Sequence, residues 1–469
     1  MRSLARILSF LAFLAGCATL PEVHPWFDGD HARATPTIVG TRGELKPTQA
    51  KALLDRLQAQ GKGGDLLARH VAIEEQLAGA PLTAGNEVTL LTDGPSSYRA
   101  MFDAIRNARD HVNAEFYIVE DDAEGRRFSD LLIAKREQGI PVNLIYDSVG
   151  SLGTPAEFFD RLRAAGVQVL QFNPVNPLEA RRGWRVNNRD HRKIVIVDGR
   201  VAFTGGINIS NVYSSSPRAR HSGSGSAPFG SEGSHPGPKE PGWRDTNVRI
   251  AGPAVAGLQK LFLAMWKRQG GAPLPERNWF PTMKPQGDQL VRIIDSGPDD
   301  ALPAIYATYI AAIRYAQKTV HLTMAYFVPD PQTLEALTDA ARRGVEVTLV
   351  LPSYTDFRAV FHAGRSHYED LLEAGVRIYE RQDALLHAKT AVIDGVWSTV
   401  GSSNLDWRSF LHNAEVNAIV LGPRFGDQME AMFRRDLQAS KRITREAWAQ
   451  RPLSVRMKEW AARLWAYWL

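Results

Sequence analysis

Short apolar runs alternate with helical stretches along the chain from about residue 86 onward. The run 88–95 begins as a strand and ends in a Gly-Pro turn, and a helical stretch at 98–111 follows it. The same succession recurs at 291–298 and 301–318. Apolar strands that alternate with helices are typical of an α/β fold in which helices cover a sheet.

The second half of the chain repeats the first half beyond this point. The apolar run 139–146 is matched by 344–351, and each run begins with glycine. A chain of 469 residues is also long enough for two domains. We therefore predict two α/β sandwich units related by pseudo-twofold symmetry, with repeat 1 at 86–285 and repeat 2 at 286–445.

One segment of repeat 1 has no counterpart in repeat 2. Residues 213–242 are rich in Ser, Gly and Pro, which is the composition of a loop that builds no core. We interpret this segment as an insertion, and we expect its two histidines, His221 and His235, to be solvated.

An extension at 17–85 precedes repeat 1. It holds two helical patterns, the first of which begins at Pro47. No residue pattern in this extension indicates chemistry. We expect it to pack on the first half of the chain or to space that half from a membrane.

The N-terminus has the pattern of an export signal. Arg2 and Arg6 precede the apolar run 7–14, which is too short to span a bilayer. Residues 1–16 are therefore predicted to be a signal peptide. No other stretch of the sequence reaches the length of a membrane span.

The run Leu-Ala-Gly-Cys at 14–17 looks like the lipobox of bacterial lipoproteins. The resemblance implies that Cys17 is acylated and becomes the first residue of a membrane-anchored protein facing the periplasm. Ala18 replaces the Asp that retains lipoproteins in the inner membrane, so the outer membrane is favoured. A plain secretory signal is the alternative. Cys17 is the only cysteine, which excludes an intramolecular disulfide.

The composition is that of a globular protein, with 44% hydrophobic and 23% charged residues. The net charge of +5 and the pI of about 9.2 fit an anionic partner. These values do not distinguish phospholipid from nucleic acid. The sequence shows no cluster with the spacing of metal ligands, and we expect neither a metal nor another cofactor.

The pattern His-x-Lys-x4-Asp-x6-Gly-(Gly/Ser)-x-Asn occurs twice, 196 residues apart. Two matching sets of this kind in two matching units indicate one shared site between them. Two histidines and two lysines that face each other suit displacement at a phosphodiester. The first set is His191, Lys193, Asp198, Gly205, Gly206 and Asn208, and the second is His387, Lys389, Asp394, Gly401, Ser402 and Asn404.

Each motif reads as a β-hairpin. In the first copy, 191–197 is a strand and Asp198-Gly199 is a turn. His191 and Lys193 then share a face, because alternate residues of a strand point the same way. The register places Lys193 opposite Gly205, where glycine lets a phosphate approach the backbone.

The remaining motif positions have different predicted roles. Asp198 and Asp394 lie at the hairpin turns, and the alternation along the strand points their side chains away from the face of the His and Lys side chains. We therefore predict a structural role for both aspartates. The segments of Asn208 and Asn404 supply amide donors, with a helix N-terminus as one possible source.

The paired motifs resemble those of the phospholipase D superfamily, over roughly residues 86–440. The contexts around His191, Trp243-Arg-Asp245 and His412-Asn-Ala-Glu415 look like bacterial cardiolipin synthases. The resemblance implies two phospholipase D-like α/β sandwich units with one shared active site and no metal.

The resemblance also implies roles for the site residues. His191 attacks phosphorus to form a phosphohistidine, while His387 acts as acid and then as base. The carboxylates of Asp245 and Glu415 orient the imidazoles, with a surface salt bridge as the alternative for either acid. Ser402 adds a hydrogen bond. The residues that stabilise charge on the phosphate oxygens are Lys193, Lys389, Asn208 and Asn404.

The implied reaction is synthesis of cardiolipin from phosphatidylglycerol. Phospholipase D-type hydrolysis to phosphatidic acid uses the same residues and stays open. A nuclease is less favoured, because the lipobox and the C-terminus point to a membrane, so no nucleic acid partner is expected. A non-enzymatic envelope lipoprotein is the last alternative.

The C-terminal segment 446–469 is predicted to be an amphipathic, Trp-rich helix. Helical spacing puts Trp460, Leu464 and Trp468 on one stripe, and basic residues accompany them. Helices at a membrane interface combine a Trp/Leu face with Lys and Arg. Docking of this helix on the protein itself is the alternative.

Overall fold

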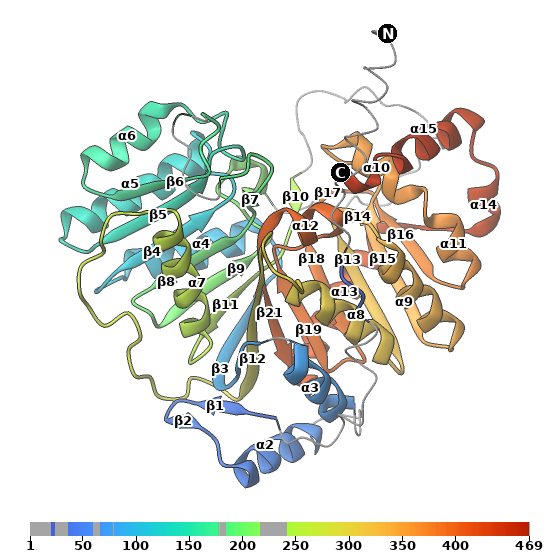
Figure 1. Cartoon of the computed structure of the whole chain (residues 1–469), viewed down its shortest axis with the longest axis horizontal. Coiled ribbons are helices and arrows are strands. Elements are labelled where there is room, and N and C mark those ends of the chain that lie inside the picture. The colour runs from blue at the N-terminus through green and yellow to red at the C-terminus, as the bar shows by residue number, and fades with distance from the viewer. Residues whose placement is uncertain are drawn as a thin grey trace, which may run out of the picture.

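The computed structural model describes residues 20–23, 36–59, 66–77, 79–176, 178, 184–215 and 242–468 (Figure 1). The predicted signal peptide and Cys17 lie outside the described residues. The same holds for most of the predicted insertion, including His221 and His235.

Among the described residues, the first unit contains a seven-stranded sheet. Its first five strands run antiparallel to their neighbours, and the last two continue parallel to the fifth. The spatial order is β3 (Leu82–Leu91), β11 (Asn247–Ala251), β9 (Val201–Gly205), β8 (Lys193–Val197), β4 (Val112–Phe116), β5 (Val142–Asp147) and β6 (Gln168–Phe172).

The second unit repeats this topology and adds one strand at its outer edge. The order is β12 (Gln289–Ser296), β21 (Asn413–Leu421), β19 (Trp397–Gly401), β18 (Lys389–Ile393), β13 (Thr319–Met324), β15 (Glu346–Pro352), β16 (Arg377–Arg381) and β22 (Ser440–Ile443).

The two sheets join through equivalent edge strands. β3 pairs antiparallel with β12, where Asn86 lies opposite Gln289 and Thr83 opposite Val291. The first strand of one unit thus pairs with the first strand of the other, as pseudo-twofold symmetry requires. The predicted α/β fold of two matching units is therefore confirmed.

Helices cover both sheets, and sequence features fix where several of them begin. The side chains of Asp93, Asp122 and Asp330 cap α4, α5 and α9 by accepting backbone N–H groups of the first turn. In unit 1 the helices are α4 (Gly94–Arg106), α5 (Ala123–Glu137), α6 (Ala156–Ala164) and α7 (Val255–Arg268). In unit 2 they include α8 (Ala304–Tyr315), α9 (Pro331–Arg342), α11 (Tyr368–Glu373) and α13 (Pro423–Gln438).

The N-terminal extension packs its helices on the second unit, so our expectation that it covers the first half is wrong for this part. Val71 of α3 shares a core with Tyr309 of α8, and Glu75 pairs with Arg292 at 2.8 Å. The reason lies in α8, which is apolar on all sides and needs a cover on its outer face. The elements are β1 (Ile38–Gly40), β2 (Gly43–Glu44), α2 (Pro47–Ala59) and α3 (Leu66–Leu77).

The C-terminal segment forms α14 (Arg445–Ala449), α15 (Leu453–Arg463) and the short turn η6 (Ala466–Trp468). Ala462 and Ala466 pack against Val360 and Ala363 of α10 (Arg358–Arg365). Within the described ranges, no helix combines the length and the apolar character needed to cross a bilayer.

Candidate active site

His191 lies in a break between two strands of the first unit. The preceding strand, β7 (Arg189–Asp190), pairs with the start of β21 from the second unit, and the His191 amide donates to Ala414 O at 2.9 Å. We predicted one continuous strand over 191–197, but β8 begins only at Lys193. The strand is interrupted because the backbone of His191 bonds to the other unit.

His387 lies in the equivalent position of the second unit. The strand before it, β17 (Leu385–Leu386), pairs with β10 (Trp243–Arg244) from the first unit. The His387 amide donates to Arg244 O at 2.8 Å. Both histidines therefore lie on the line where the units meet, as Figure 1 shows for β7, β10 and β17.

Each imidazole is held by a carboxylate of the opposite unit. His191 Nδ1 lies 2.9 Å from Glu415 Oε1, and His387 Nδ1 lies 2.7 Å from Asp245 Oδ2. Both carboxylates are fully buried. Because Nδ1 donates to the carboxylate, the nitrogen left for chemistry is Nε2 in both rings. The sequence pointed to these two acids but not to their exchange between units.

Burial and nearby cations act on both imidazoles. Burial, Lys193 and Lys389 together lower the pKa of His191 well below its ordinary value. Burial and Lys389 also lower the pKa of His387, while Asp245 opposes this change. Both imidazoles are therefore neutral near pH 7 in the protein without substrate, and Asp245 counteracts part of the decrease at His387.

The two motif lysines are buried next to the histidines. Each ammonium donates to the carbonyl of the histidine two residues before it. Burial lowers the pKa of Lys193 to about 7 and that of Lys389 to about 8. An anion that entered the site would stabilise both charged forms, so the site is arranged to receive a phosphate.

The glycines of the motifs have a role that differs from our prediction. A side chain at Gly205 would overlap Asn247 Oδ1, and one at Gly401 would overlap Asn417 Oδ1. We predicted open backbone for a phosphate, but neighbouring strands already occupy this space. These glycines therefore permit close packing of β9 on β11 and of β19 on β21.

Gly206 and Ser402 differ because their carboxylates differ. A Cβ at Gly206 would overlap the carboxylate of Asp245, which leaves room for hydrogen alone. At the equivalent position Ser402 Oγ donates to Glu415 Oε2. The Asp245 carboxylate instead accepts the amide N–H of Thr246 at 2.7 Å. The pair Asp245–Gly206 in one unit and the pair Glu415–Ser402 in the other therefore fill equivalent spaces with different side chains.

Asn208 and Asn404 lie two residues before helix caps rather than in the first turn of a helix. Ser210 caps η5 (Asn211–Tyr213), and Asp406 caps α12 (Trp407–Leu411). Asn208 Oδ1 accepts from the amide of Ile118 at 3.1 Å, and its Nδ2 lies 3.3 Å from Tyr213 Oη. Asn404 Oδ1 is buried without a partner among the described residues.

The two motif aspartates anchor the hairpin turns to the loops that connect α4 to β4 and α8 to β13. Asp198 Oδ1 accepts the amides of Asp110 and His111 at 2.7 and 3.0 Å. Asp394 Oδ1 accepts that of Lys318 at 2.7 Å, and Asp394 Oδ2 lies 3.3 Å from His70 Nε2. Both have positive φ, as the first of the two central residues of a type I′ turn does.

The sequence did not reveal a set of aromatic residues around the histidines. Tyr213 Oη lies 3.3 Å from His387 Nδ1, and the ring of Trp243 lies 5.0 Å from that of His387. Tyr117 packs edge-on against His191 with ring centroids 5.0 Å apart. Tyr213 stands at the first position of the segment that we read as a loop, yet it is buried. A lone aromatic at that boundary was the only signal.

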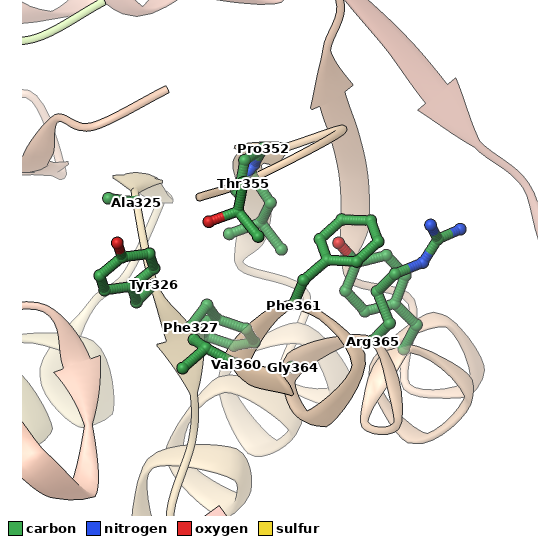
Figure 2. Close-up of a pocket in the computed structure, with 11 residues that line it drawn as sticks. Ala325, Tyr326, Phe327, Pro352, Thr355, Val360, Phe361, Gly364 and Arg365 are labelled. Carbon is green, nitrogen blue, oxygen red and sulfur yellow. The ribbon is translucent and has the colours of Figure 1, made fainter. Parts of the chain in front are cut away.

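A small, partly open hollow lies in the second unit (Figure 2). Apolar side chains dominate its lining, among them Phe327, Val360 and Phe361. Tyr326 forms one wall, donates to Asp356 Oδ1 at 2.6 Å and packs near His387 with ring centroids 6.3 Å apart. The site therefore has an apolar neighbour that lies between His387 and α10.

The part of the chain that the structure describes holds no group of three or more His, Cys, Asp or Glu residues able to bind a metal ion. The side chains that carry positive charge at the site include Lys193 and Lys389, and both are buried.

Comparison with known proteins gives consistent results. A family described as "Cardiolipin synthase, PLD-like domain" matches residues 101–216 and 309–437. The chain is 36% identical over 387 residues to cardiolipin synthase 1 of Staphylococcus epidermidis, which covers 82% of this chain and 74% of that protein. It is 34% identical over 437 residues to a cardiolipin synthase of a Geobacillus species, which covers 89% and 81%.

The fold also resembles a solved structure. Phosphatidylserine synthase of Haemophilus influenzae superposes with a TM-score of 0.63 at 14% identity. The match covers 86% of this chain and 100% of that one. At this identity the likeness concerns the fold alone.

Proposed function

Since the chain belongs to the family of cardiolipin synthases with a phospholipase D-like domain, we propose that it is a phosphatidyltransferase. It transfers the phosphatidyl group of one phosphatidylglycerol to a second and releases glycerol. The observation that carries this proposal is the pair of crossed histidine–carboxylate contacts, His191–Glu415 and His387–Asp245, beside two buried lysines.

In the first step Nε2 of His191 attacks phosphorus, and the P–O bond to glycerol breaks. His387 gives its Nε2 proton to the departing alkoxide, which leaves as glycerol. The product is a phosphatidyl group on His191 and a neutral His387. Glu415 stabilises the positive charge that His191 acquires during the attack.

In the second step a glycerol hydroxyl of another phosphatidylglycerol attacks the same phosphorus. His387 removes its proton as the new P–O bond forms, and the N–P bond to His191 breaks. Cardiolipin leaves, and both rings return to their starting protonation states. One proton moves out and one moves back, so the cycle needs no cofactor.

The assignment of His191 as the nucleophile is supported by the charges around each ring. The pKa of His191 is lowered by burial and by two lysines, which keeps its imidazole neutral. Burial and Lys389 also lower the pKa of His387, but Asp245 opposes this change, and an anionic phosphate in the site would raise the pKa and favour the protonated ring. A nucleophile needs the neutral ring and an acid needs the charged one.

The negative charge that develops on the phosphate oxygens is stabilised by Lys193, Lys389, Asn208 and Asn404. The lysines supply cations in a buried setting, where such contacts are stronger than in water. Asn404 is buried at the site and would act through its Nδ2 group, because the amide nitrogen is the donor of this side chain.

The same residues would hydrolyse the lipid if water reached the phosphohistidine before an alcohol did. Aromatic rings at the site, including Tyr117 and Trp243, lie against the two histidines and favour exclusion of water. Hydrolysis to phosphatidic acid is therefore the second candidate function.

We further propose that Cys17 carries a lipid anchor and that the enzyme faces the periplasm from the outer membrane. The support is the run Leu-Ala-Gly-Cys at 14–17 after a charged and apolar start, together with Ala18. Export of the native chain with and without Cys17→Ser, followed by membrane fractionation and the mass of the N-terminal peptide, tests this. An unmodified Cys17 in the mature protein would contradict it.

The test of the activity is mass spectrometry of lipids after incubation of the Cys17→Ser chain with phosphatidylglycerol vesicles. Cardiolipin and glycerol should form, and His191→Ala should abolish both. His321→Ala is the matched control, because His321 also pairs with a carboxylate, Glu430 at 3.0 Å, outside the site. Phosphatidic acid as the sole product would establish the hydrolase instead.

A further inference from the structure

His191 lies on the side of the first sheet where β4, β5 and β6 end, and the loops on this side, which we call the carboxyl-end edge, expose apolar side chains. Phe116 lies opposite Lys193 and Tyr146, so the carboxyl ends of β4 and β5 reach this edge, and β6 runs parallel beside them. The loops that leave β5 and β6 here expose large apolar residues. They are Val149 and Leu152 after β5, Val175 after β6, and Val186 shortly before β7.

The second unit presents α15 at the corresponding edge. Met324 lies opposite Lys389, so the carboxyl end of β13, and of the parallel β15 next to it, reaches the edge of His387. The chain passes from β15 into α10, and α15 packs on α10. Figure 1 shows α10 and α15 on the same upper side of the molecule as β7, β10 and β17.

One face of α15 is an exposed apolar stripe. Leu453, Met457, Trp460 and Leu464 follow each other at helical spacing, and their exposed fractions are 70, 63, 66 and 65%. Trp465 adds 57%. Such a stripe exceeds what a solvated helix of a monomer usually shows. The side chain of Trp468, which we predicted to continue the stripe, lies outside the described side chains.

The opposite face of α15 is already satisfied by the protein. Glu459 is buried and accepts from Arg451 Nε at 2.9 Å, and Ala462 packs on α10. The two alternatives drawn from the sequence, docking on the protein and facing a membrane, therefore apply to different faces of the same helix. The exposed stripe is not part of the core of this chain.

The charges of α15 suit an anionic surface. Arg456, Lys458 and Arg463 are exposed, while the acid Glu459 is buried. Basic residues beside a Trp/Leu stripe are the arrangement that binds the interface of anionic bilayers.

We propose that this edge is a bilayer-docking face that seats both halves of the active site against the membrane. The α15 stripe on one side of the histidines, and Val149, Leu152, Val175 and Val186 on the other side, enter the headgroup region of an anionic phospholipid bilayer. The proposal rests on the proposed function, since it supplies the enzyme with its lipid substrate directly from the bilayer.

A single fluorophore tests the position of the face. Cys17→Ser removes the only cysteine, so Trp460→Cys in that full chain places an environment-sensitive dye on α15 alone. Phosphatidylglycerol–phosphatidylcholine vesicles should shift its emission to the blue. Phe280→Cys is the matched control, because Phe280 is also exposed, at 45%. Its neighbours Trp279 and Pro281 contact Gly199 in the β8–β9 turn, which lies at the opposite end of β8 from His191. A dye at 460 that stays in water on vesicle-bound protein would overturn the proposal.

A second variant links the face to turnover. The double variant Trp460→Glu, Leu464→Glu should weaken vesicle binding by at least about tenfold, because two apolar side chains that would be buried in the bilayer are replaced by charged ones. Turnover of vesicle lipid should fall with it, while turnover of short-chain phosphatidylglycerol dissolved as monomers should not. Unchanged vesicle binding would refute the docking face. Binding through α15 without any turnover of either lipid would leave the face intact and refute the proposed function.

Discussion

His191 of the first unit donates from Nδ1 to Glu415 of the second unit, with the two atoms 2.9 Å apart. The reciprocal contact joins His387 of the second unit to Asp245 of the first at 2.7 Å. Neither unit therefore holds a complete histidine–carboxylate pair by itself. The reacting site depends on how the two units dock, in the way that isologous interfaces create shared sites.

The carboxylates should matter for rate more than for stability. Glu415→Gln keeps the shape but loses the charge that supports His191 during the attack. We expect kcat to fall by about 10²–10⁴, as loss of an orienting acid does in hydrolase triads. Rapid-quench measurement of phosphoenzyme should show that its formation is the slowed step. Glu430→Gln removes the partner of His321 and should leave kcat unchanged; equal rate losses in both variants would contradict the assignment.

The lysines predict an alkaline limit to activity. Burial lowers the pKa of Lys193 to about 7 and that of Lys389 to about 8 in the protein without substrate. A lowered lysine pKa means that the cation is lost as pH rises through this range, so kcat/KM should decrease above about pH 7–8. A pH profile of kcat/KM between pH 5 and 10 checks this. Lys193→Arg keeps its charge throughout, and its profile should lose the limb that belongs to Lys193.

Much of this arrangement follows from sequence, because local patterns carry it. The repeated His-x-Lys and Asp-Gly positions predicted two hairpins. In the register of β8 and β9, Ile194 lies opposite Thr204, and the same register continued by one residue places Lys193 opposite Gly205. The crossing of Glu415 to His191 did not follow, since it depends on docking between units rather than on neighbours in the chain. The same limit explains the helices of the N-terminal extension, whose partner α8 lies more than 200 residues away.

The motif glycines show a second limit of sequence reasoning. Glycine indicates that something comes close to the backbone, but it does not say whether that is a ligand or the protein. At Gly205 it is Asn247 of the next strand. Tyr213 was missed for a related reason, because the polar segment after it hid a buried ring.

Tyr213 should be a positioning residue for His387. Its hydroxyl lies 3.3 Å from His387 Nδ1 and 3.3 Å from Asn208 Nδ2. Tyr213→Phe keeps the ring and removes both contacts, so we expect kcat to fall about threefold to tenfold, as for one or two neutral hydrogen bonds. The limb of the pH profile that reports His387 should shift as well. A change in KM alone, with kcat and the pH profile unaltered, would show that Tyr213 contacts only substrate.

Asp394 should contribute to stability and not to chemistry. Its carboxylate accepts backbone amides at 317–319 and contacts His70. Burial raises its pKa, but the contacts with His70 and these amides outweigh burial, and the pKa is lowered overall. A lowered carboxyl pKa stabilises the fold above the unfolded value of about 4, and this contribution is lost as pH falls below it.

Removal of the Asp394 carboxylate tests this role. Asp394→Ala should lower the free energy of unfolding by about 2–4 kcal/mol at pH 7, because the backbone N–H groups at 317–319 and the buried His70 lose their acceptor. The difference from the parent should shrink as pH falls below about 4. Chemical denaturation at several pH values measures this. The kcat of the folded fraction should stay within about twofold, and its loss would assign Asp394 to the chemistry.

The Asp–Gly and Glu–Ser pairs predict an asymmetric response to exchange between the units. Ser402→Gly removes one hydrogen bond to Glu415, so we expect kcat to fall by about threefold to thirtyfold while the fold persists. Gly206→Ser forces an atom into the space of the Asp245 carboxylate, which must move away from His387. We expect kcat to fall by about 10² or more in that variant, because displacement of a catalytic group by an ångström costs about this much.

The control for this exchange removes the carboxylate that the new serine would overlap. Gly206→Ser combined with Asp245→Ala should fold as well as Asp245→Ala alone, since the carboxylate that clashes is absent. Thermal unfolding of the three proteins separates packing from chemistry. Equal activity in Gly206→Ser and the parent would show that the Asp245 carboxylate has room to move and does not fix the orientation of His387.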